Sequence, residues 1–159
     1  MRRSARRRVA GSPRVRDKKL KVLFLCTGNA CRSQMSEAWA RHLAGDYIEA
    51  YSAGTDPHGV DPRAVKAMAE VGVDMSAHWS KHVDSFADVP FDYVVTVCDN
   101  AAESCPTSPK GARRLHASFQ DPPRLAREAR SEEEALTHYR RVRDQIRLFI
   151  EALPATLQS

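Results

Sequence analysis

Two side chains that can act together on an oxyanion, Cys26 and Arg32, lie in one short loop. The loop reads Cys26, Thr27, Gly28, Asn29, Ala30, Cys31, Arg32 and Ser33, and a helical pattern follows it. Backbone N–H groups of such a loop can converge on an anion, and the positive end of the following helix points to the same place. The Arg32 guanidinium suits a tetrahedral oxyanion, the positive field favours the thiolate of Cys26, and Ser33 can donate a hydrogen bond to the sulfur. The loop therefore predicts covalent cysteine catalysis on phosphate or a phosphate mimic, although its spacing alone fits a buried structural cysteine beside a surface arginine equally well.

The elements around this loop alternate between strand and helix. The patterns predict strands at 21–25, 47–52, 92–97 and 113–119, and helices at 33–44, 61–72 and from 131 onward. This alternation, with no internal repeat, predicts an α/β fold: a three-layer sandwich with a four-stranded parallel sheet and helices on both faces. Ligands of such sheets bind at the carboxyl ends of the strands, so we expect the loop and the segment after the third strand to meet there.

Each predicted helix has a recognisable boundary or apolar face. Gly45 is expected to stop the first helix, whose apolar face is Met35, Ala38, Trp39 and Leu43. Asp61 and Pro62 supply the N-cap and first position of the second. Ser131 and Glu134 form a capping box for the last helix, and Pro154 is expected to end it. That helix carries one apolar stripe, which predicts core packing: Leu136, Tyr139, Val142, Ile146, Phe149, Ile150 and Leu153.

The charge of the chain is unevenly distributed. Its 159 residues carry a net charge of +5, yet residues 1–19 alone hold nine Lys or Arg and one acid, which leaves the remainder mildly acidic. We expect residues 1–19 to be a basic, disordered extension and residues 20–155 to form one catalytic α/β domain. The extension could bind nucleic acid or anionic lipid nonspecifically, but it has no aromatic residue to stack on bases. A transit peptide, or a start codon placed too far upstream, would have the same composition.

The four cysteines, at positions 26, 31, 98 and 105, form no Cys-x-x-Cys pair. In a chain without a signal peptide or membrane span, which we expect to be cytoplasmic, such cysteines favour redox or metal chemistry over a structural disulfide framework. If residues 98–105 were helical, the two α-carbons would lie about 10 Å apart, beyond the roughly 7 Å that a disulfide spans. A Cys98–Cys105 disulfide would therefore require this short segment to unwind. The alternative is that both cysteines are small buried hydrophobic residues.

Several motifs together resemble one enzyme family. They are the run Cys26 to Glu37, the sequence Tyr51-Ser52-Ala53-Gly54, the Cys98/Cys105 pair and Asp121-Pro122. This set is similar to the thioredoxin-coupled arsenate reductases, which share the low-molecular-weight tyrosine phosphatase fold, from about Leu20 to Leu153. The loop alone would also fit the phosphatases, whereas the cysteine pair favours the reductases.

The resemblance implies a cysteine relay. Cys26 would attack arsenate held by the loop amides of residues 27–33 and by Arg32, while Asp121 protonates the departing hydroxide. Cys98 would attack the sulfur of Cys26, releasing arsenite, and Cys105 would then attack Cys98 and expose a disulfide to thioredoxin. No bound cofactor or metal is implied, and we expect a monomer without membrane or nucleic-acid partners.

Three loop or turn residues, Asn29, Asp121 and Lys81, allow two interpretations each. By the resemblance Asn29 braces the loop, and Asp121 is the acid, but either could be an ordinary turn residue. Cys31 has no step in the relay and is interpreted as structural. Some relatives bind potassium beside the loop through positions matching Asn29, Glu37, Ser52 and an acidic residue. Lys81 stands at that last position here, so we expect it to supply the positive charge, unless it is an exposed loop lysine.

Two other functions are considered. A tyrosine phosphatase would use Cys26, Arg32 and Asp121 without the relay. A non-enzymatic zinc protein would use all four cysteines, but their spacings do not match known zinc sites and Arg32 would have no purpose. The six histidines, at 42, 58, 78, 82, 116 and 138, form no metal-binding signature.

Overall fold

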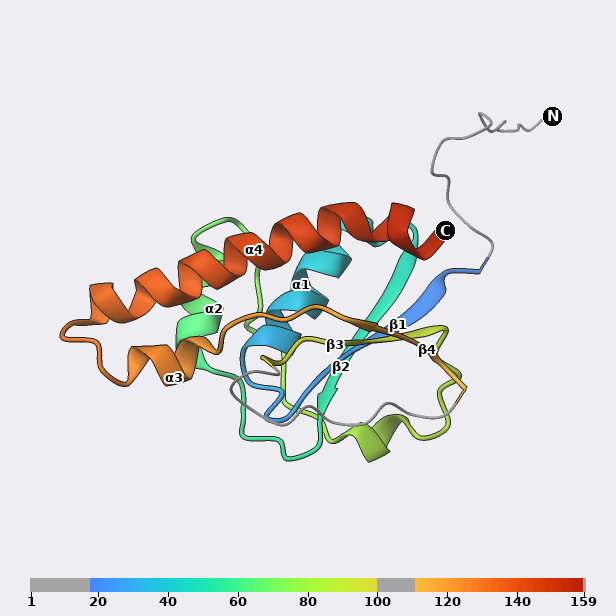
Figure 1. Ribbon diagram of the computed structural model, residues 1–159, viewed down its shortest axis with the longest axis horizontal. Coiled ribbons are helices and arrows are strands. Elements are labelled where there is room, and N and C mark those ends of the chain that lie inside the picture. Colours follow the sequence, from blue (N-terminus) through green and yellow to red (C-terminus); the bar gives the residue numbers. More distant parts are fainter. Residues whose placement is uncertain (1–17, 100–110, 159) are drawn as a thin grey trace.

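The computed structural model describes residues 18–99 and 111–158 (Figure 1). The strands are β1 (Leu20–Cys26), β2 (Ile48–Gly54), β3 (Tyr93–Thr96) and β4 (Arg113–His116). The α-helices are α1 (Arg32–Ala44), α2 (Pro62–Ala69), α3 (Pro122–Ala126) and α4 (Glu132–Gln158), and η1 (Val83–Phe86) is a 3-10 helix. Residues 1–17 of the predicted extension, and Cys105, lie outside the described residues.

The sheet has four parallel strands in the order β2-β1-β3-β4, as the alternating pattern predicted. Strand β1 is central, and its residues Val22 to Leu25 are fully buried, since both faces of the sheet are covered there. The register pairs Leu25 with Thr96 and Cys26 with Gly54. The carboxyl ends of β1, β2 and β3 therefore meet at one edge of the sheet.

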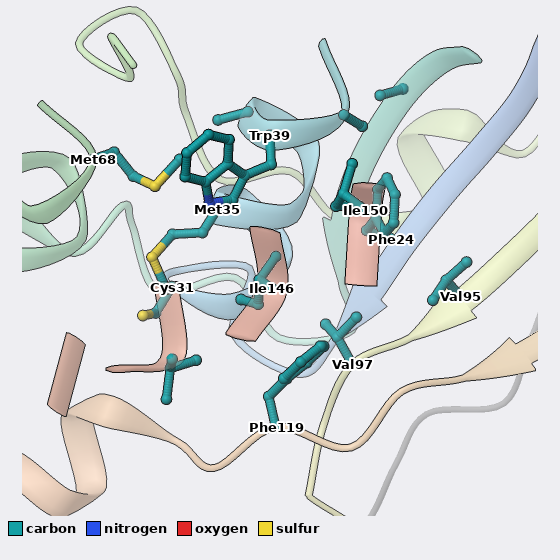
Figure 2. Close-up of a cluster of buried hydrophobic side chains, with 14 of the residues drawn as sticks. Phe24, Cys31, Met35, Trp39, Met68, Val95, Val97, Phe119, Ile146 and Ile150 are labelled. Atoms are coloured by element: carbon teal, nitrogen blue, oxygen red, sulfur yellow. The ribbon is translucent and has the colours of Figure 1, made fainter. Parts of the chain in front are cut away.

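The two faces of the sheet are covered unequally. The main core lies between the sheet and α1 and α4, where Phe24 and Val95 of the sheet face Met35, Ile146 and other apolar side chains (Figure 2). A smaller cluster around Leu23, Leu25 and Val94 lies on the opposite face, under η1 and its flanking loops. The predicted three-layer α/β sandwich is confirmed, and its second helical layer, in the described part of the chain, is the short η1 (Figure 1).

Helix α1 follows the loop as predicted, but its apolar face was assigned wrongly at Leu43, which is 39% exposed. Every residue from Arg32 to Ala40 is buried, including the polar Gln34 and Glu37. Because α1 is enclosed on all sides near the loop, a one-sided apolar stripe does not describe it. The last turn buries Ala44 in place of Leu43.

Helix α4 begins at its predicted capping box, where the Glu134 N–H donates to Ser131 Oγ at 3.0 Å. Six of the seven stripe residues are buried, and Phe149 is half-buried against the same core. The prediction that Pro154 ends the helix is wrong, because α4 continues to Gln158 with Pro154 inside it. Leu157 is buried in the core and its carbonyl accepts a hydrogen bond from Tyr93 Oη at 3.0 Å, which secures the final turn.

In the described part of the chain, every helix is too short or too polar to span a membrane.

Candidate active site

The loop between β1 and α1 is held in place by hydrogen bonds from neighbouring segments to its carbonyl groups. Thr27, Gly28 and Ala30 each present a carbonyl oxygen that accepts a backbone N–H from the segment after β2, namely from Asp56, His58 and Asp61 at 2.9–3.0 Å. The Asn29 carbonyl accepts from Gln34 Nε2 at 3.1 Å and from Ser80 Oγ at 2.6 Å. With four successive carbonyls turned outward, the amides of the loop are available to an anion at its centre. We call residues 56–61 the strap.

Asn29 fixes the middle of the loop. Its φ of 47° makes it the one non-glycine residue with positive φ in the described part of the chain, and Asn tolerates this conformation. Its side-chain oxygen accepts from the Lys81 N–H at 2.8 Å and from Gln34 Nε2 at 3.0 Å. Its amide nitrogen donates to Ser33 Oγ at 2.7 Å. Asn29 therefore has both the strained turn conformation and the bracing contacts that the sequence suggested as alternatives.

The sulfur of Cys26 lies at the base of the loop and receives two donors. Ser33 Oγ is 2.9 Å from it, and the Asn29 N–H points to it at 3.3 Å. Because Ser33 Oγ already accepts from the Asn29 amide, its own proton is available to the sulfur. Both donors therefore point at the sulfur atom that would attack an anion bound in the loop.

Arg32 and Asp121 come together from opposite ends of the fold. The Arg32 guanidinium is 5% exposed, donates to the Phe119 carbonyl at 3.0 Å, and lies 3.5 Å from the Asp121 carboxylate. Asp121 precedes α3, yet its side chain makes no capping hydrogen bond to that helix. A turn-forming role therefore does not account for its carboxyl group.

A pocket of about 470 Å³ opens at the loop, and Cys26, Arg32 and Asp121 all line it. His58 and Arg127 also line the pocket, from the strap and from the end of α3. Cys26, Arg32 and Asp121, which are up to 95 positions apart in the sequence, thus face one cavity, and residues of the loop line the same cavity. This arrangement can bind a tetrahedral oxyanion and present it to a thiolate.

Gly54 is required by a close approach to the loop. A Cβ at this position would lie 2.3 Å from the Thr27 carbonyl oxygen and 2.9 Å from the Asn29 nitrogen. Both neighbours are backbone atoms, so neither can move without distorting the loop.

Cys31 is buried and is a free thiol. Figure 2 shows its side chain in the core, near Met35 and Ile146. Burial raises the pKa of this thiol well above its usual value, and the negative charges of Asp61 and Asp121 raise it further. A thiol held protonated is a poor nucleophile, which agrees with the structural interpretation of Cys31.

Cys98 follows β3 at the same edge of the sheet. The Val97 N–H donates to the Leu25 carbonyl at 3.1 Å, so Cys98 stands one residue beyond a direct backbone contact with the chain that leads into Cys26. Cys98 is fully buried and disulfide-bonded, whereas Cys26 is a free thiol. The proposed partner of Cys98 in the relay, Cys105, lies outside the described residues.

Lys81 is not an exposed loop lysine, because only 8% of its side chain is accessible. Its ammonium donates to the Trp79 carbonyl at 2.7 Å and lies 3.6 Å from Glu37 Oε1, which also accepts a hydrogen bond from Ser52 Oγ at 2.5 Å. Burial lowers the pKa of Lys81, and Glu37 opposes that shift. Glu37, one of the residues expected to bind potassium, lies beside an ammonium group here, and a second cation at this position would be repelled, so these residues do not fit a potassium ion.

Sequence reasoning missed several residues that shape the loop. Gln34 donates to three carbonyl or amide oxygens around Asn29 and accepts from His78 Nδ1 at 2.8 Å. Asp61, expected only as a helix cap, also accepts a hydrogen bond from Tyr139 Oη. The sequence signal for these roles was weak, because each depends on contacts between residues more than 40 positions apart or on a buried helix face.

Residues 21–159 match the family described as low molecular weight phosphotyrosine protein phosphatase. The chain belongs to this family. An arsenate reductase of Bacillus subtilis (strain 168) is 49% identical over 125 residues, covering 79% of this chain and 88% of that protein. A solved structure described as an arsenate reductase in the phosphate binding state superimposes with a TM-score of 0.69 at 30% identity, covering 86% of this chain and 98% of the other.

A third relative is named for its reductant. The thioredoxin-dependent arsenate reductase of Corynebacterium glutamicum superimposes with a TM-score of 0.61 at 25% identity, covering 88% of this chain and 64% of that one. The resemblance to arsenate reductases that the sequence motifs indicated is therefore confirmed, together with the phosphatase-like fold.

Proposed function

We propose that this protein reduces arsenate to arsenite through a cysteine relay that thioredoxin resets. The observation that carries the proposal is that two cysteines lie at one sheet edge. Cys26 lies in an oxyanion loop, and Cys98 lies just beyond the neighbouring strand and is fully buried. A phosphatase needs the first cysteine only, so the second cysteine at the same edge favours the reductase. The similarity to proteins named arsenate reductase supports the same conclusion.

The first step is nucleophilic attack on arsenate. The loop amides and the Arg32 guanidinium hold the arsenate oxygens, and the thiolate of Cys26 attacks arsenic. An S–As bond forms and one As–O bond breaks. Asp121, which lines the same pocket, gives its proton to the departing hydroxide, which leaves as water. Arg32 contacts both the anion site and Asp121, so it aligns the acid with the bound anion.

The second step transfers two electrons. The thiolate of Cys98 attacks the Cys26 sulfur, an S–S bond forms, and the electron pair of the S–As bond stays on arsenic. Arsenic is reduced from As(V) to As(III) and leaves as arsenite, while two thiols are oxidised to a Cys26–Cys98 disulfide. The burial of Cys98 at the carboxyl edge next to β1 supports this assignment.

The third step restores Cys26. Cys105 attacks Cys98, the Cys26 thiolate leaves, and the resulting Cys98–Cys105 disulfide is reduced by thioredoxin. A third thiol is useful because Cys26 is 3% exposed, which hinders direct attack by a protein reductant. We expect this chemistry in the cytoplasm, from a monomer without a bound cofactor.

A coupled assay tests the proposal. NADPH oxidation is followed with thioredoxin and thioredoxin reductase after arsenate is added, and thioredoxin is omitted in the control. We expect arsenate-dependent oxidation that requires thioredoxin and is lost in Cys98→Ser and in Cys105→Ser. Arsenate-dependent turnover that persists without Cys98 would contradict the relay, and turnover supported equally by a glutaredoxin or mycothiol system would contradict the assigned reductant.

A further inference from the structure

Asp61 places a carboxylate in the wall of the pocket at the loop. Cys26 and Arg32 line the same pocket. The Asp61 N–H donates to the Ala30 carbonyl at 2.9 Å, so this residue lies directly against the loop. Within residues 18–99 and 111–158, Asp61 forms no ion pair that would neutralise its charge. A negative charge in this wall opposes the binding of any anion.

The structural contacts of Asp61 do not require a charge. Its Oδ1 accepts the Arg63 N–H at 2.9 Å as the N-cap of α2, and its other carboxylate oxygen accepts a hydrogen bond from Tyr139 Oη. Asparagine caps helices as well as aspartate does, and its amide group can also pair with a hydroxyl group. The contact with Ala30 uses only the backbone of Asp61. The fold alone therefore does not account for the charge of this side chain.

The charge of Asp61 reaches the loop. Burial is the main cause that raises the pKa of the Cys31 thiol, and the negative charge of Asp61 comes next, ahead of that of Asp121. Cys31 lies between Ala30 and Arg32 in the loop that binds the anion. An anion held by the amides of this loop therefore experiences the field of the same carboxylate.

Arsenate and sulfate have the same tetrahedral shape but differ in protonation. At neutral pH arsenate keeps a proton on at least one oxygen, as phosphate does, whereas sulfate has none. The loop amides and Arg32 are all donors, so by themselves they favour the anion without a proton. A carboxylate can accept a hydrogen bond from a protonated oxygen, and it repels an unprotonated one.

Asp61 is the acceptor in this pocket. Each carboxylate oxygen can accept two hydrogen bonds, so its contacts with Arg63 and Tyr139 leave capacity for a further donor. The other carboxyl group that lines the pocket belongs to Asp121, which lies 3.5 Å from the Arg32 guanidinium and donates its proton in the proposed reaction. Asp61 is thus left to receive a proton-bearing oxygen of the anion.

We propose that Asp61 determines which oxyanions occupy the loop: it accepts a hydrogen bond from a proton-bearing oxygen of arsenate and rejects fully deprotonated anions such as sulfate. The inference rests on the proposed function in placing arsenate in the loop, but it needs neither Cys98 nor Cys105. Sulfate has the right shape for the loop amides and Arg32, so without Asp61 it would compete with arsenate for them. Asp61 lowers the affinity for every anion, and it lowers the affinity for sulfate most.

Protection of Cys26 from alkylation tests the proposal. The reduced full-length protein reacts with iodoacetamide at neutral pH in rising phosphate or sulfate, with choline chloride holding the ionic strength constant, and peptide mass spectrometry follows the labelling of Cys26. The concentration that halves the labelling rate gives the affinity of each anion for the loop. We expect the parent protein to prefer phosphate to sulfate. This preference should fall roughly tenfold in Asp61→Asn, as for the loss of one hydrogen bond to a charged group.

Asp74→Asn is the matched control. Asp74 accepts the Ser76 N–H at 2.8 Å, two residues further along the chain, just as Asp61 accepts from Arg63, but it does not line the pocket at the loop. This variant should keep the preference for phosphate. Asp61→Ser, which caps a helix without a charge, should lose the preference as Asp61→Asn does.

The ratio of the two affinities is informative because general damage to the loop weakens both anions together. An unchanged ratio in Asp61→Asn and Asp61→Ser, or an equal fall in Asp74→Asn, would overturn the proposal. Arsenate reduction by the parent protein is measured in parallel. If reduction is normal and the ratio does not respond to Asp61, this inference alone is wrong. If phosphate does not protect Cys26 in the parent protein, the proposed function is contradicted as well.

Discussion

Replacing Lys81 tests whether the protein carries its own cation beside the loop. The Lys81 ammonium lies 3.6 Å from Glu37 Oε1, and the side chains of Lys81 and Glu37 are 8% and 4% exposed. Lys81→Ala would leave the Glu37 carboxylate with Arg41 at its other oxygen and with the Ser52 hydroxyl. The Lys81 N–H that braces Asn29 belongs to the backbone and is kept.

The expected destabilisation follows from burial and from the remaining partner. Removing one member of a buried ion pair costs about 3–5 kcal/mol, because the other charge is left uncompensated. The Arg41 guanidinium still neutralises part of Glu37, although it is 58% exposed and therefore screened by solvent. We expect the free energy of unfolding to fall by about 2–3 kcal/mol, and the midpoint of thermal unfolding to fall by about 4–12 °C for a chain of this size.

The assay compares thermal unfolding and arsenate turnover in potassium chloride and in choline chloride at equal ionic strength. In the parent protein, potassium should change neither quantity, since an ammonium group already lies beside Glu37. In Lys81→Ala, potassium can approach the Glu37 carboxylate and the Trp79 carbonyl, which the ammonium contacts in the parent, and it should recover part of the lost stability. At ten times its dissociation constant, it would recover about 1.4 kcal/mol.

Lys66→Ala is the control, because Lys66 is an exposed lysine of α2 and its loss should have little effect. The reasoning would be refuted if potassium activated the parent protein. It would also be refuted if Lys81→Ala were no less stable than Lys66→Ala.

Three further predictions concern the loop and its supports. The pKa of His78 is lowered, mainly by burial. As the pH falls, the unfolded chain therefore takes up a proton first, and stability is lost as the pH falls through about 6.5. The variant His78→Asn keeps a donor to Gln34, and urea unfolding should show that it loses less stability than the parent protein between pH 7 and 5. Gly54→Ala, whose methyl group would meet Thr27 and Asn29 backbone atoms, should raise the KM for arsenate at least tenfold, and an unchanged KM would contradict the described contact. Asp121→Asn should lower kcat by about 10²–10⁴-fold with little change in thermal stability, whereas a large loss of stability would indicate a structural role.

Much of the fold could be predicted because its signals are local. The apolar run 21–25 and the caps at Asp61 and Ser131 are read from neighbouring residues, and all of them appear in the structure. Pro154 shows where local rules fail: a proline in the last turns of a long helix is retained because Leu157 and its carbonyl are held by the core and by Tyr93. The prediction that Leu43 belongs to the buried face of α1 is wrong for a related reason, since α1 is enclosed by other elements and has no single apolar face.

The candidate site was predictable where one segment carries the chemistry. Cys26, Arg32 and Ser33 belong to one continuous loop, so their types and spacing were enough to indicate an oxyanion site. The strap, Gln34 and the Glu37–Lys81 pair act through contacts with distant segments, and only the folded structure brings these together.

The most direct test of the central claim is the arsenite produced by Cys26→Ser, measured by chromatographic separation of arsenite and arsenate in the complete thioredoxin system. The sulfur of Cys26 is the atom that bonds to arsenic in the first step proposed, and serine keeps the size of the side chain without a stable anion. We predict arsenite formation at the level of the enzyme-free blank. Arsenite formation at the rate of the parent protein would contradict the account.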